Sequence, residues 1–219
     1  MLFLIRHGER ADDSTNAEKQ RIILSFDPHL SQNGETQAKK TGKYIRNILK
    51  LHSINKIVLV TSPYLRCIQT VIGIANQLEQ EIEIYIAKGL GECFRQDWFE
   101  QDILKELHYY KGSQIYQHIF QQYSFLDVPY QEVIQQYPES IQEFFGRFSE
   151  NYKRMREHFT NNNILVVTHG YGVHAVNMLE KQIISNNADY CSVNVIQYQK
   201  DNVDYLLLNS TAHLKKSKL

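Results

Sequence analysis

Short apolar runs alternate with longer amphipathic segments along the chain. Two of the apolar runs are rich in Ile and Val, which is typical of strands in the middle of a sheet that is covered on both faces. The pattern predicts strands over Leu2–Ile5, Ile57–Val60, Ile82–Ile86, Ile164–Val167, Val193–Tyr198 and Tyr205–Leu208.

The amphipathic segments predict helices between these strands. Apolar residues recur in them at helical spacing. Ser31 is the expected N-cap of the first helix, and Ser62 with Pro63 is expected to open the second. A turn at Lys200-Asp201-Asn202 is expected to join the last two strands as a hairpin. The predicted helices run from Ser31 to Leu51, from Pro63 to Leu78, from about Glu139 to Phe159, and from after Gly170 to near Lys181.

Strands that alternate with helices predict an α/β fold, a three-layer α/β/α sandwich around a mainly parallel central sheet. In such sheets, catalytic loops gather at the carboxyl ends of the strands. Arg6 and His7 directly follow the first predicted strand, and His169 follows the fourth. We therefore expect these side chains to lie at one edge of the sheet.

Residues 93–138 interrupt the alternation of strands and helices. The segment is rich in Gln and aromatic residues, including Trp98, Phe99 and Tyr110. We expect an insertion that packs over the carboxyl edge of the sheet as a lid. The alternative is an ordinary helical excursion that only completes the core. No repeat or linker divides the chain, so one domain over residues 1–219 is expected.

Composition narrows the classes of function. The 24 Lys and Arg residues balance 24 Asp and Glu residues, so no global field attracts nucleic acid or an acidic membrane. No apolar run approaches the ~18 residues that a membrane-spanning helix needs. Cys67, Cys93 and Cys191 are widely spaced and form no CxxC pair, which indicates reduced thiols in an intracellular protein.

Three arginines and a histidine form the first group of candidate site residues. Phosphoryl transfer requires positive charge around three equatorial oxygens and a nucleophile in line with the leaving group. Arg6, Arg10 and Arg66 can each present a planar fork of donors to such oxygens. His7 lies between two of them in sequence, and nearby cations lower the pKa of a histidine, which favours the nucleophilic neutral form. His7 is therefore the candidate nucleophile, able to carry the phosphoryl group covalently.

His169 and Glu92 form the second group. His169 precedes a predicted helix, and both a helix N-terminus and an imidazolium stabilise negative charge. Glu92 follows the strand Ile82–Ile86 and a Gly-rich turn, and it is the best candidate to protonate the leaving oxygen. Burial under the insertion would raise its pKa, as a general acid requires.

These residues belong to motifs that resemble the histidine phosphatase superfamily, which contains the cofactor-dependent phosphoglycerate mutases. The motifs follow one another in the expected order over nearly the whole chain. The RHGER and SPxLRCIQT forms are most similar to the branch of the UBASH3-type tyrosine phosphatases and the ecdysteroid phosphatases. The four motifs are Leu4–Arg10 (LIRHGER), Leu30–Ala38 (LSQNGETQA), Ser62–Thr70 (SPYLRCIQT) and Thr168–Gly170 (THG).

The resemblance implies a phosphoglycerate mutase-like fold and a phosphatase that needs no metal and no cofactor. It implies that His7 accepts the phosphoryl group and that Arg6, Arg66 and His169 complete the phosphate pocket. Arg10 matches the additional arginine of the RHGER branch. Glu92 falls where that branch keeps its acid, although its surroundings, GLGECF, match only loosely.

The remaining histidines and Glu9 are expected to have no role in the chemistry. His174 is expected to face away from the pocket, and Glu9 to hold an arginine or a backbone amide. Cys67 is expected to pack in the core. No ligand-like spacing predicts a metal site among the other histidines, which are His29, His52, His108, His118, His158 and His213.

Two alternative functions stay open. A phosphoglycerate mutase-type phosphotransferase would share the pocket, but the chain lacks a Trp-rich segment after RHG. A catalytically weak phospholigand-binding module would have lost a pocket residue, and none is lost. The expected partner is a phosphorylated small molecule or a phosphopeptide, with no nucleic acid and no membrane, and the sequence allows a homodimer.

The chain ends in Ser217-Lys218-Leu219. This tripeptide is the C-terminal peroxisome address, which is read only in a eukaryote and only when the tail is free. A cytoplasmic location is expected, with the peroxisome as the alternative.

Overall fold

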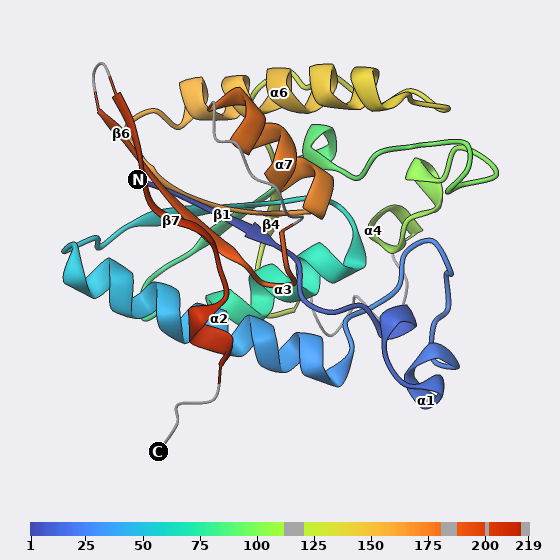
Figure 1. Cartoon of the computed structure of the whole chain (residues 1–219), viewed down its shortest axis with the longest axis horizontal. Helices are drawn as coiled ribbons and strands as arrows, with labels where there is room; N and C mark the ends of the chain where they lie inside the picture. The colour runs from blue at the N-terminus through green and yellow to red at the C-terminus, as the bar shows by residue number, and fades with distance from the viewer. Residues whose placement is uncertain (112–120, 181–187, 200–201, 216–219) are drawn as a thin grey trace.

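A computed structural model describes residues 1–111, 121–180, 188–199 and 202–215. Its centre is a seven-stranded sheet with the order β4-β3-β2-β5-β1-β6-β7 (Figure 1). The strands are β1 (Leu2–Arg6), β2 (Ile57–Thr61), β3 (Glu83–Ile86), β4 (Phe125–Asp127), β5 (Asn163–Thr168), β6 (Val193–Gln199) and β7 (Asn202–Ser210).

The first five strands of the chain run parallel to one another, whereas β6 runs antiparallel to its two neighbours, β1 and β7. β1 pairs in parallel with β5, with Arg6 opposite Thr168, and antiparallel with β6 on its other side. β6 and β7 form the predicted hairpin, whose last pair is Gln199 and Asn202. Lys200 and Asp201 of the predicted turn lie outside the described residues. The prediction of a mainly parallel sheet is confirmed.

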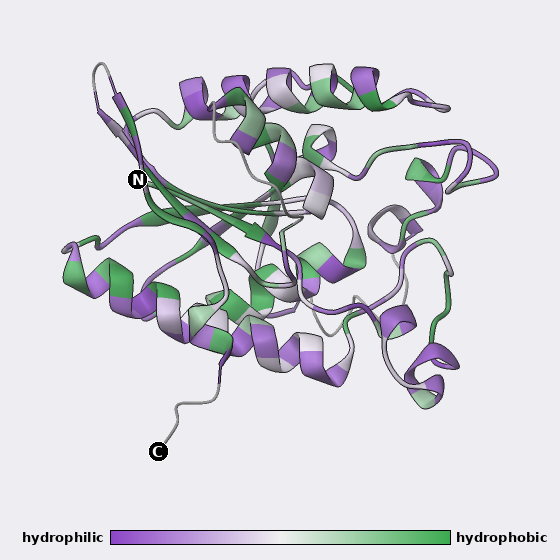
Figure 2. Cartoon of the chain, viewed as in Figure 1, coloured by the Kyte–Doolittle hydropathy of each residue, from purple (hydrophilic) through white to green (hydrophobic). Residues whose placement is uncertain are grey.

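Helices cover both faces of the sheet (Figure 1). On one side lie α2 (Gln32–Leu51) and α3 (Leu65–Ala75), and on the other lie α6 (Ile141–His158) and α7 (Gly170–Leu179). The central strands are hydrophobic along their length, whereas α2 and α6 alternate hydrophobic and polar positions (Figure 2). The three-layer sandwich is thus confirmed. The shorter elements are η1 (Ala11–Asp13), α1 (Asn16–Lys19), η2 (Lys88–Leu90), η3 (Leu104–Glu106), α4 (His108–Lys111) and η4 (Ala212–Leu214).

The core consists of two clusters separated by the sheet. Successive side chains of a strand point to opposite faces, so Phe3 and Ile5 of β1 pack in the cluster with α2 and α3. Leu2 and Leu4 of the same strand pack in the cluster with α6 and α7. This double burial explains why the strands are continuous apolar runs.

The helix starts agree with the sequence in one case and differ in another. Ser31 caps α2 as predicted, because its Oγ accepts a hydrogen bond from the Gly34 amide at 2.9 Å. Ser62 does not cap α3, which begins only at Leu65 after an N-cap at Tyr64. The predicted cap and the predicted first turn at Pro63 were therefore wrong.

The predicted insertion at residues 93–138 has two parts with different places in the fold. Trp98 and Phe99 line the cavity at the carboxyl edge of the sheet. Further along, β4 pairs in parallel with β3 and extends the sheet, a strand that the sequence did not predict. The described residues of the segment therefore contribute both to the cavity and to the central sheet. Residues 112–120 lie outside the described residues.

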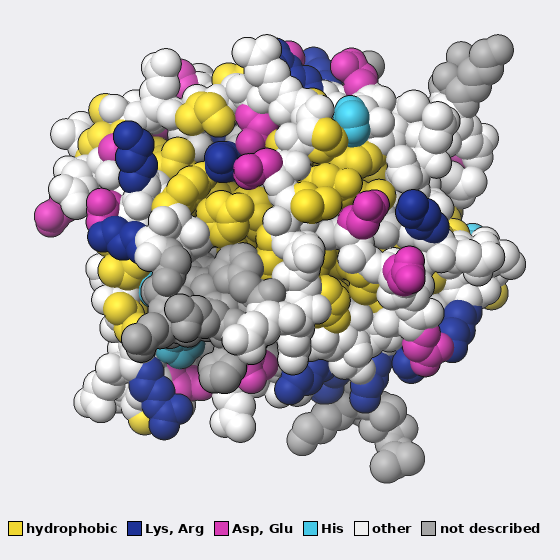
Figure 3. Space-filling model, turned by 180° about the vertical axis from the view of Figure 1, so that it is seen from behind, with side chains coloured by type: hydrophobic (Ala, Val, Ile, Leu, Met, Phe, Trp, Pro, Cys, Tyr) yellow, Lys and Arg dark blue, Asp and Glu magenta, His cyan; other side chains and the backbone are white. Residues whose placement is uncertain are grey.

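The strand β4 forms one end of the sheet. Its Leu126 is 42% exposed. Seen from behind, apolar side chains gather beside residues outside the described ranges (Figure 3).

In the described part of the chain, no helix combines the length and the hydrophobicity needed to cross a membrane. The C-terminal Ser217, Lys218 and Leu219 also lie outside the described residues.

Candidate active site

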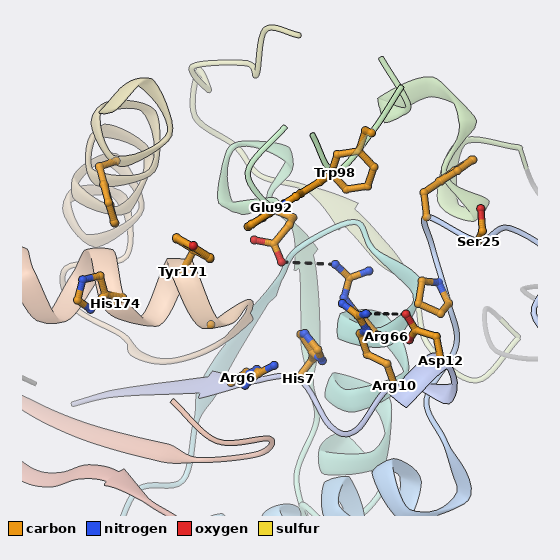
Figure 4. A pocket seen from close by; sticks show the side chains of 15 residues that line it. Arg6, His7, Arg10, Asp12, Ser25, Arg66, Glu92, Trp98, Tyr171 and His174 are labelled. Atoms are coloured by element: carbon orange, nitrogen blue, oxygen red, sulfur yellow. Dashed lines mark hydrogen bonds and ion pairs between the residues drawn. The ribbon is translucent and has the colours of Figure 1, made fainter. Parts of the chain in front are cut away.

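The candidate residues lie together at the carboxyl edge of the sheet. His7 directly follows β1, and His169 follows the neighbouring β5 as the N-cap of α7. Arg66 comes from the first turn of α3, which follows β2, and Glu92 follows β3 and η2. His7, Arg66 and Glu92 line one cavity of about 780 Å³ (Figure 4). His169 is fully buried and contacts Arg66.

The loop that carries His7 is held by the second and third motifs. The Gly8 amide donates to Thr70 Oγ1 at 3.0 Å, and the Glu9 amide donates to Gln37 Oε1 at 2.9 Å. A Cβ on Gly34 would lie 2.2 Å from the Glu9 carbonyl oxygen, so only glycine permits this close approach. The Glu9 side chain accepts from Ser31 Oγ and Asn33 Nδ2, rather than from an arginine or a backbone amide.

The imidazole of His7 is oriented as a nucleophile. Its Nδ1 lies 2.8 Å from the carbonyl oxygen of Gly8. A carbonyl oxygen only accepts hydrogen bonds, so Nδ1 carries the proton and Nε2 keeps its lone pair. Burial, followed by the charges of Arg66 and Arg6, lowers the pKa of His7 well below its usual value. The neutral form that can attack phosphorus therefore dominates.

Arg66 has the most central position in the site. Its side chain is only 3% exposed, and Nη2 lies 3.2 Å from His169 Nδ1 and 3.6 Å from Glu92 Oε2. Within the described structure, Nε and Nη1 have no hydrogen-bond partner. Nη1 lies 3.9 Å from the carboxylate of Asp27. The guanidinium group lines the cavity, where its charge would stabilise an anion.

Arg6 lies beside His7 in the same cavity (Figure 4). Its Nη1 donates to the Ala188 carbonyl at 2.7 Å, and its guanidinium lies 4.0 Å from the ring centroid of Tyr190. The Nε of Arg6 is buried and has no partner among the described residues. The guanidinium group of Arg6 also lines the cavity, where its charge would stabilise an anion.

Arg10 lines the same cavity but is already paired. Its Nε and Nη2 donate to the two carboxylate oxygens of Asp12 at 2.9 and 2.5 Å, and Asp13 lies 3.6 Å from Nε. This bidentate pair engages two of the three guanidinium nitrogens that were expected to bind phosphate. A role of Arg10 in phosphate binding stays a prediction.

His169 is a buried neutral imidazole. Arginine only donates, so the contact with Arg66 makes Nδ1 the acceptor, and Nε2 donates to Ser62 Oγ at 2.8 Å. Burial and the charges of Arg66, His7 and Arg6 lower its pKa well below the usual value. The imidazolium expected from the sequence is thus not the form that the cavity favours before an anion binds.

Glu92 is placed to hold a proton. Its side chain is 13% exposed, and Oε2 lies 3.3 Å from His169 Nδ1 and 3.6 Å from Arg66 Nη2. Burial raises the pKa of Glu92, with Arg66 acting in the opposite direction.

Three residues near the site were missed by sequence reasoning. Asp27 is fully buried, accepts from the Leu65 amide at 2.8 Å and lies 3.9 Å from Arg66 Nη1. Ser62 bonds to His169, and Tyr190 packs 5.6 Å from the His7 ring between centroids. Ser62 lies in a motif, which is the one signal that singled it out.

Two further expectations from the sequence have different outcomes. His174 lines the cavity rather than facing away, with its ring 5.8 Å from that of Phe145, so that prediction was wrong. Cys67 is fully buried as expected, and burial raises the pKa of its thiol. In the described ranges, no three His, Cys, Asp or Glu side chains gather as a metal site would require.

The chain belongs to the histidine phosphatase superfamily (branch 1), because the model of that family matches residues 2–211. No curated protein matches the sequence. Among solved structures, YhfR of Bacillus stearothermophilus is 19% identical, with a TM-score of 0.63 and 98% of each chain covered. Phosphoserine phosphatase of Entamoeba histolytica is also 19% identical, with a TM-score of 0.62 and the same coverage.

A third structure is the α-ribazole phosphatase of Shigella flexneri. It is 20% identical, with a TM-score of 0.60, and the match covers 95% of this chain and 96% of the other. At these identities the likeness shows the fold alone. Together with the family model, it confirms the phosphoglycerate mutase-like fold that the motifs implied.

Proposed function

We propose that the protein hydrolyses phosphomonoesters through a phosphohistidine at His7. The observation that carries the proposal is the Nε2 lone pair of a buried neutral imidazole, in a cavity that the guanidinium groups of Arg6 and Arg66 also line. Such donors stabilise the charge that spreads over the equatorial oxygens during phosphoryl transfer. Membership of the histidine phosphatase superfamily supports this reading.

The reaction has two steps in this proposal. In the first, a bond forms between His7 Nε2 and phosphorus, the ester P–O bond breaks, and the leaving oxygen takes the proton of Glu92. In the second, water attacks phosphorus while Glu92 takes back a proton, and the N–P bond breaks. The products are an alcohol and inorganic phosphate, and the enzyme returns to its initial state.

The substrate is a phosphorylated small molecule or a phosphopeptide. Structural neighbours carry the names of phosphatases of phosphoserine and of α-ribazole phosphate, which supports the first of these. The RHGER form of the motif supports placement near the UBASH3-type and ecdysteroid phosphatases. Arg10, the residue that characterises this form, is held here by Asp12.

Trapping the phosphoenzyme tests the proposal. Phosphate on a histidine nitrogen is labile in acid but survives alkali, so a rapid alkaline quench during turnover should yield a species one phosphoryl group heavier. The label should map to the peptide that contains Arg6-His7-Gly8. A binding module would show saturable affinity without this adduct, and a mutase would pass the group to an added phosphoglycerate. Turnover without any label on His7 would favour direct attack by water.

The role of Glu92 predicts a dependence on the leaving group. Aryl phosphates leave with little help from an acid, whereas alkyl phosphates need protonation. Glu92→Gln should lower kcat/KM for phenethyl phosphate by about 10²- to 10⁴-fold and that for p-nitrophenyl phosphate by less than about tenfold. Equal losses on both substrates would show that Glu92 only positions the site.

The same variant should change the pH profile. Activity requires neutral His7 and protonated Glu92, so it is lost below the lowered pKa of His7 and above the raised pKa of Glu92. Glu92→Gln removes the alkaline limb that belongs to the carboxyl. The wild type and Glu92→Gln are compared on the same substrate, so the ionisation of the substrate affects both pH profiles equally. Glu100→Gln is the matched control, since Glu100 is exposed.

A further inference from the structure

Glu92 lies on a loop without regular secondary structure. Residues 91–94 belong to no helix or strand, and the Oε1 of Glu92 accepts a hydrogen bond from the neighbouring Cys93 amide, at 3.2 Å. Its position relative to a leaving oxygen therefore depends on what holds the backbone of this loop. A displacement of about 1 Å in such a group costs about 10²-fold in rate.

Arg147 of α6 holds that backbone. Its side chain is 4% exposed. Nη1 donates to the Gly89 carbonyl at 2.8 Å, and Nη2 donates to the carbonyl of Glu92 itself at 3.2 Å. One guanidinium thus binds the loop at two points, on the turn before the acid and at the acid.

Glu139 pairs with Arg147 and holds the loop after Glu92. It takes a bidentate pair of hydrogen bonds from Arg147, Nε to Oε1 at 2.6 Å and Nη2 to Oε2 at 2.8 Å. Its Oε2 also accepts from the Phe94 amide at 3.3 Å, and its own amide donates to the Phe94 carbonyl at 2.8 Å. The backbone is therefore fixed on both sides of Glu92 by one buried ion pair.

Asn151, one helical turn after Arg147, reinforces the same segment. Its Nδ2 lies 3.4 Å from the Gly89 carbonyl oxygen and donates to the Val133 carbonyl at 2.9 Å. A Cβ on Gly89 would lie 2.3 Å from Asn151 side-chain atoms. Two polar side chains of α6, Arg147 and Asn151, therefore contact the turn that precedes Glu92.

We infer that Arg147, paired with Glu139, is a positioning residue for Glu92. It sets the distance between the carboxyl of Glu92 and the leaving oxygen, without touching the substrate. The inference rests on the proposed function, since it needs Glu92 to be the general acid. A buried ion pair by itself is weak evidence for stabilisation, whereas two contacts to the backbone of one catalytic loop give this pair a specific task.

The variant Arg147→Lys tests the inference. Lysine keeps the charge opposite Glu139 but cannot reach both carbonyls at once, because it lacks the planar fork. We expect kcat/KM for phenethyl phosphate to fall about 10- to 100-fold and that for p-nitrophenyl phosphate to fall less than about threefold. Arg154→Lys is the matched control on the same helix, since Arg154 pairs with Glu150 at the surface. It should leave both rates unchanged.

Combining the variants distinguishes positioning from general stability. In a Glu92→Gln background, Arg147→Lys should lower the rate on phenethyl phosphate by less than about twofold, because the two residues act as one unit. Full additivity, or equal losses on both substrates, would overturn the inference. If Glu92→Gln alone shows no dependence on the leaving group, the proposed acid role fails and the inference with it. Should Arg147→Lys not fold, Glu139→Gln provides the same test through the other partner.

Discussion

Replacing His7 with alanine is expected to lower kcat for p-nitrophenyl phosphate by at least about 10⁴-fold, because a covalent mechanism loses its nucleophile. The p-nitrophenolate group of this substrate leaves without protonation, so the loss cannot be attributed to the general acid. Steady-state kinetics with enough enzyme to detect the residual rate measure the change. The remaining arginines should still bind inorganic phosphate, which calorimetry can show.

The control for this variant is His158→Ala. His158 lies at the end of α6, and its ring packs on Phe159 at 4.8 Å between centroids, away from the cavity. Its replacement should leave kcat within about twofold. If His7→Ala keeps more than about one hundredth of the wild-type kcat, water attacks phosphorus directly, and His7 is reassigned as a phosphate ligand or base.

The central strands could be predicted from hydrophobic runs because they are buried on both faces. β4 was not predicted. Of its residues Phe125–Asp127, Leu126 and Asp127 are exposed, so no apolar run marks the strand. Its place in the sheet follows from pairing with β3, more than thirty residues earlier in the chain, which no local pattern encodes.

The start of α3 shows how tertiary contacts override a local signal. Ser62-Pro63 has the composition of an N-cap and a first helical turn. In the structure, the Ser62 hydroxyl is taken by His169, 107 residues away, at 2.8 Å. The helix begins at Leu65, where the carboxylate of Asp27 accepts from the backbone amide. A side chain from a distant loop therefore replaces the cap that the sequence suggested.

The location of the site could be predicted because carboxyl ends of parallel strands meet at one edge. What the sequence could not provide is which donors are occupied. Arg6, Arg10 and Arg66 are equivalent in the sequence. In the structure, Arg10 donates two hydrogen bonds to Asp12, whereas the acidic neighbours of Arg66 lie farther away, Asp27 at 3.9 Å and Glu92 at 3.6 Å. Charge pairing of this kind is decided by geometry, and it ranks Arg66 first among the arginines.

Arg66→Ala is therefore expected to lower kcat/KM for p-nitrophenyl phosphate by about 10³-fold. Most of the loss should be in kcat, because the charge on the equatorial oxygens is best stabilised in the transition state. Arg66→Lys should recover only part of it, since an ammonium ion provides a charge but no fork. Arg46→Ala, which removes a surface arginine paired with Glu79, is the control and should have no effect.

The fold should tolerate the removal of Arg66, so the kinetic loss can be interpreted. Asp27, its buried acidic neighbour, keeps hydrogen bonds from the Leu65 amide and from the amide and Nδ1 of His108. The carboxylate is therefore not left without partners, and thermal unfolding of the variant should remain cooperative. A loss in kcat/KM smaller than about tenfold in a folded Arg66→Ala protein would mean that Arg6 and the N-terminus of α7 suffice to stabilise the transferring group. The ranking of Arg66 first among the arginines would then be wrong.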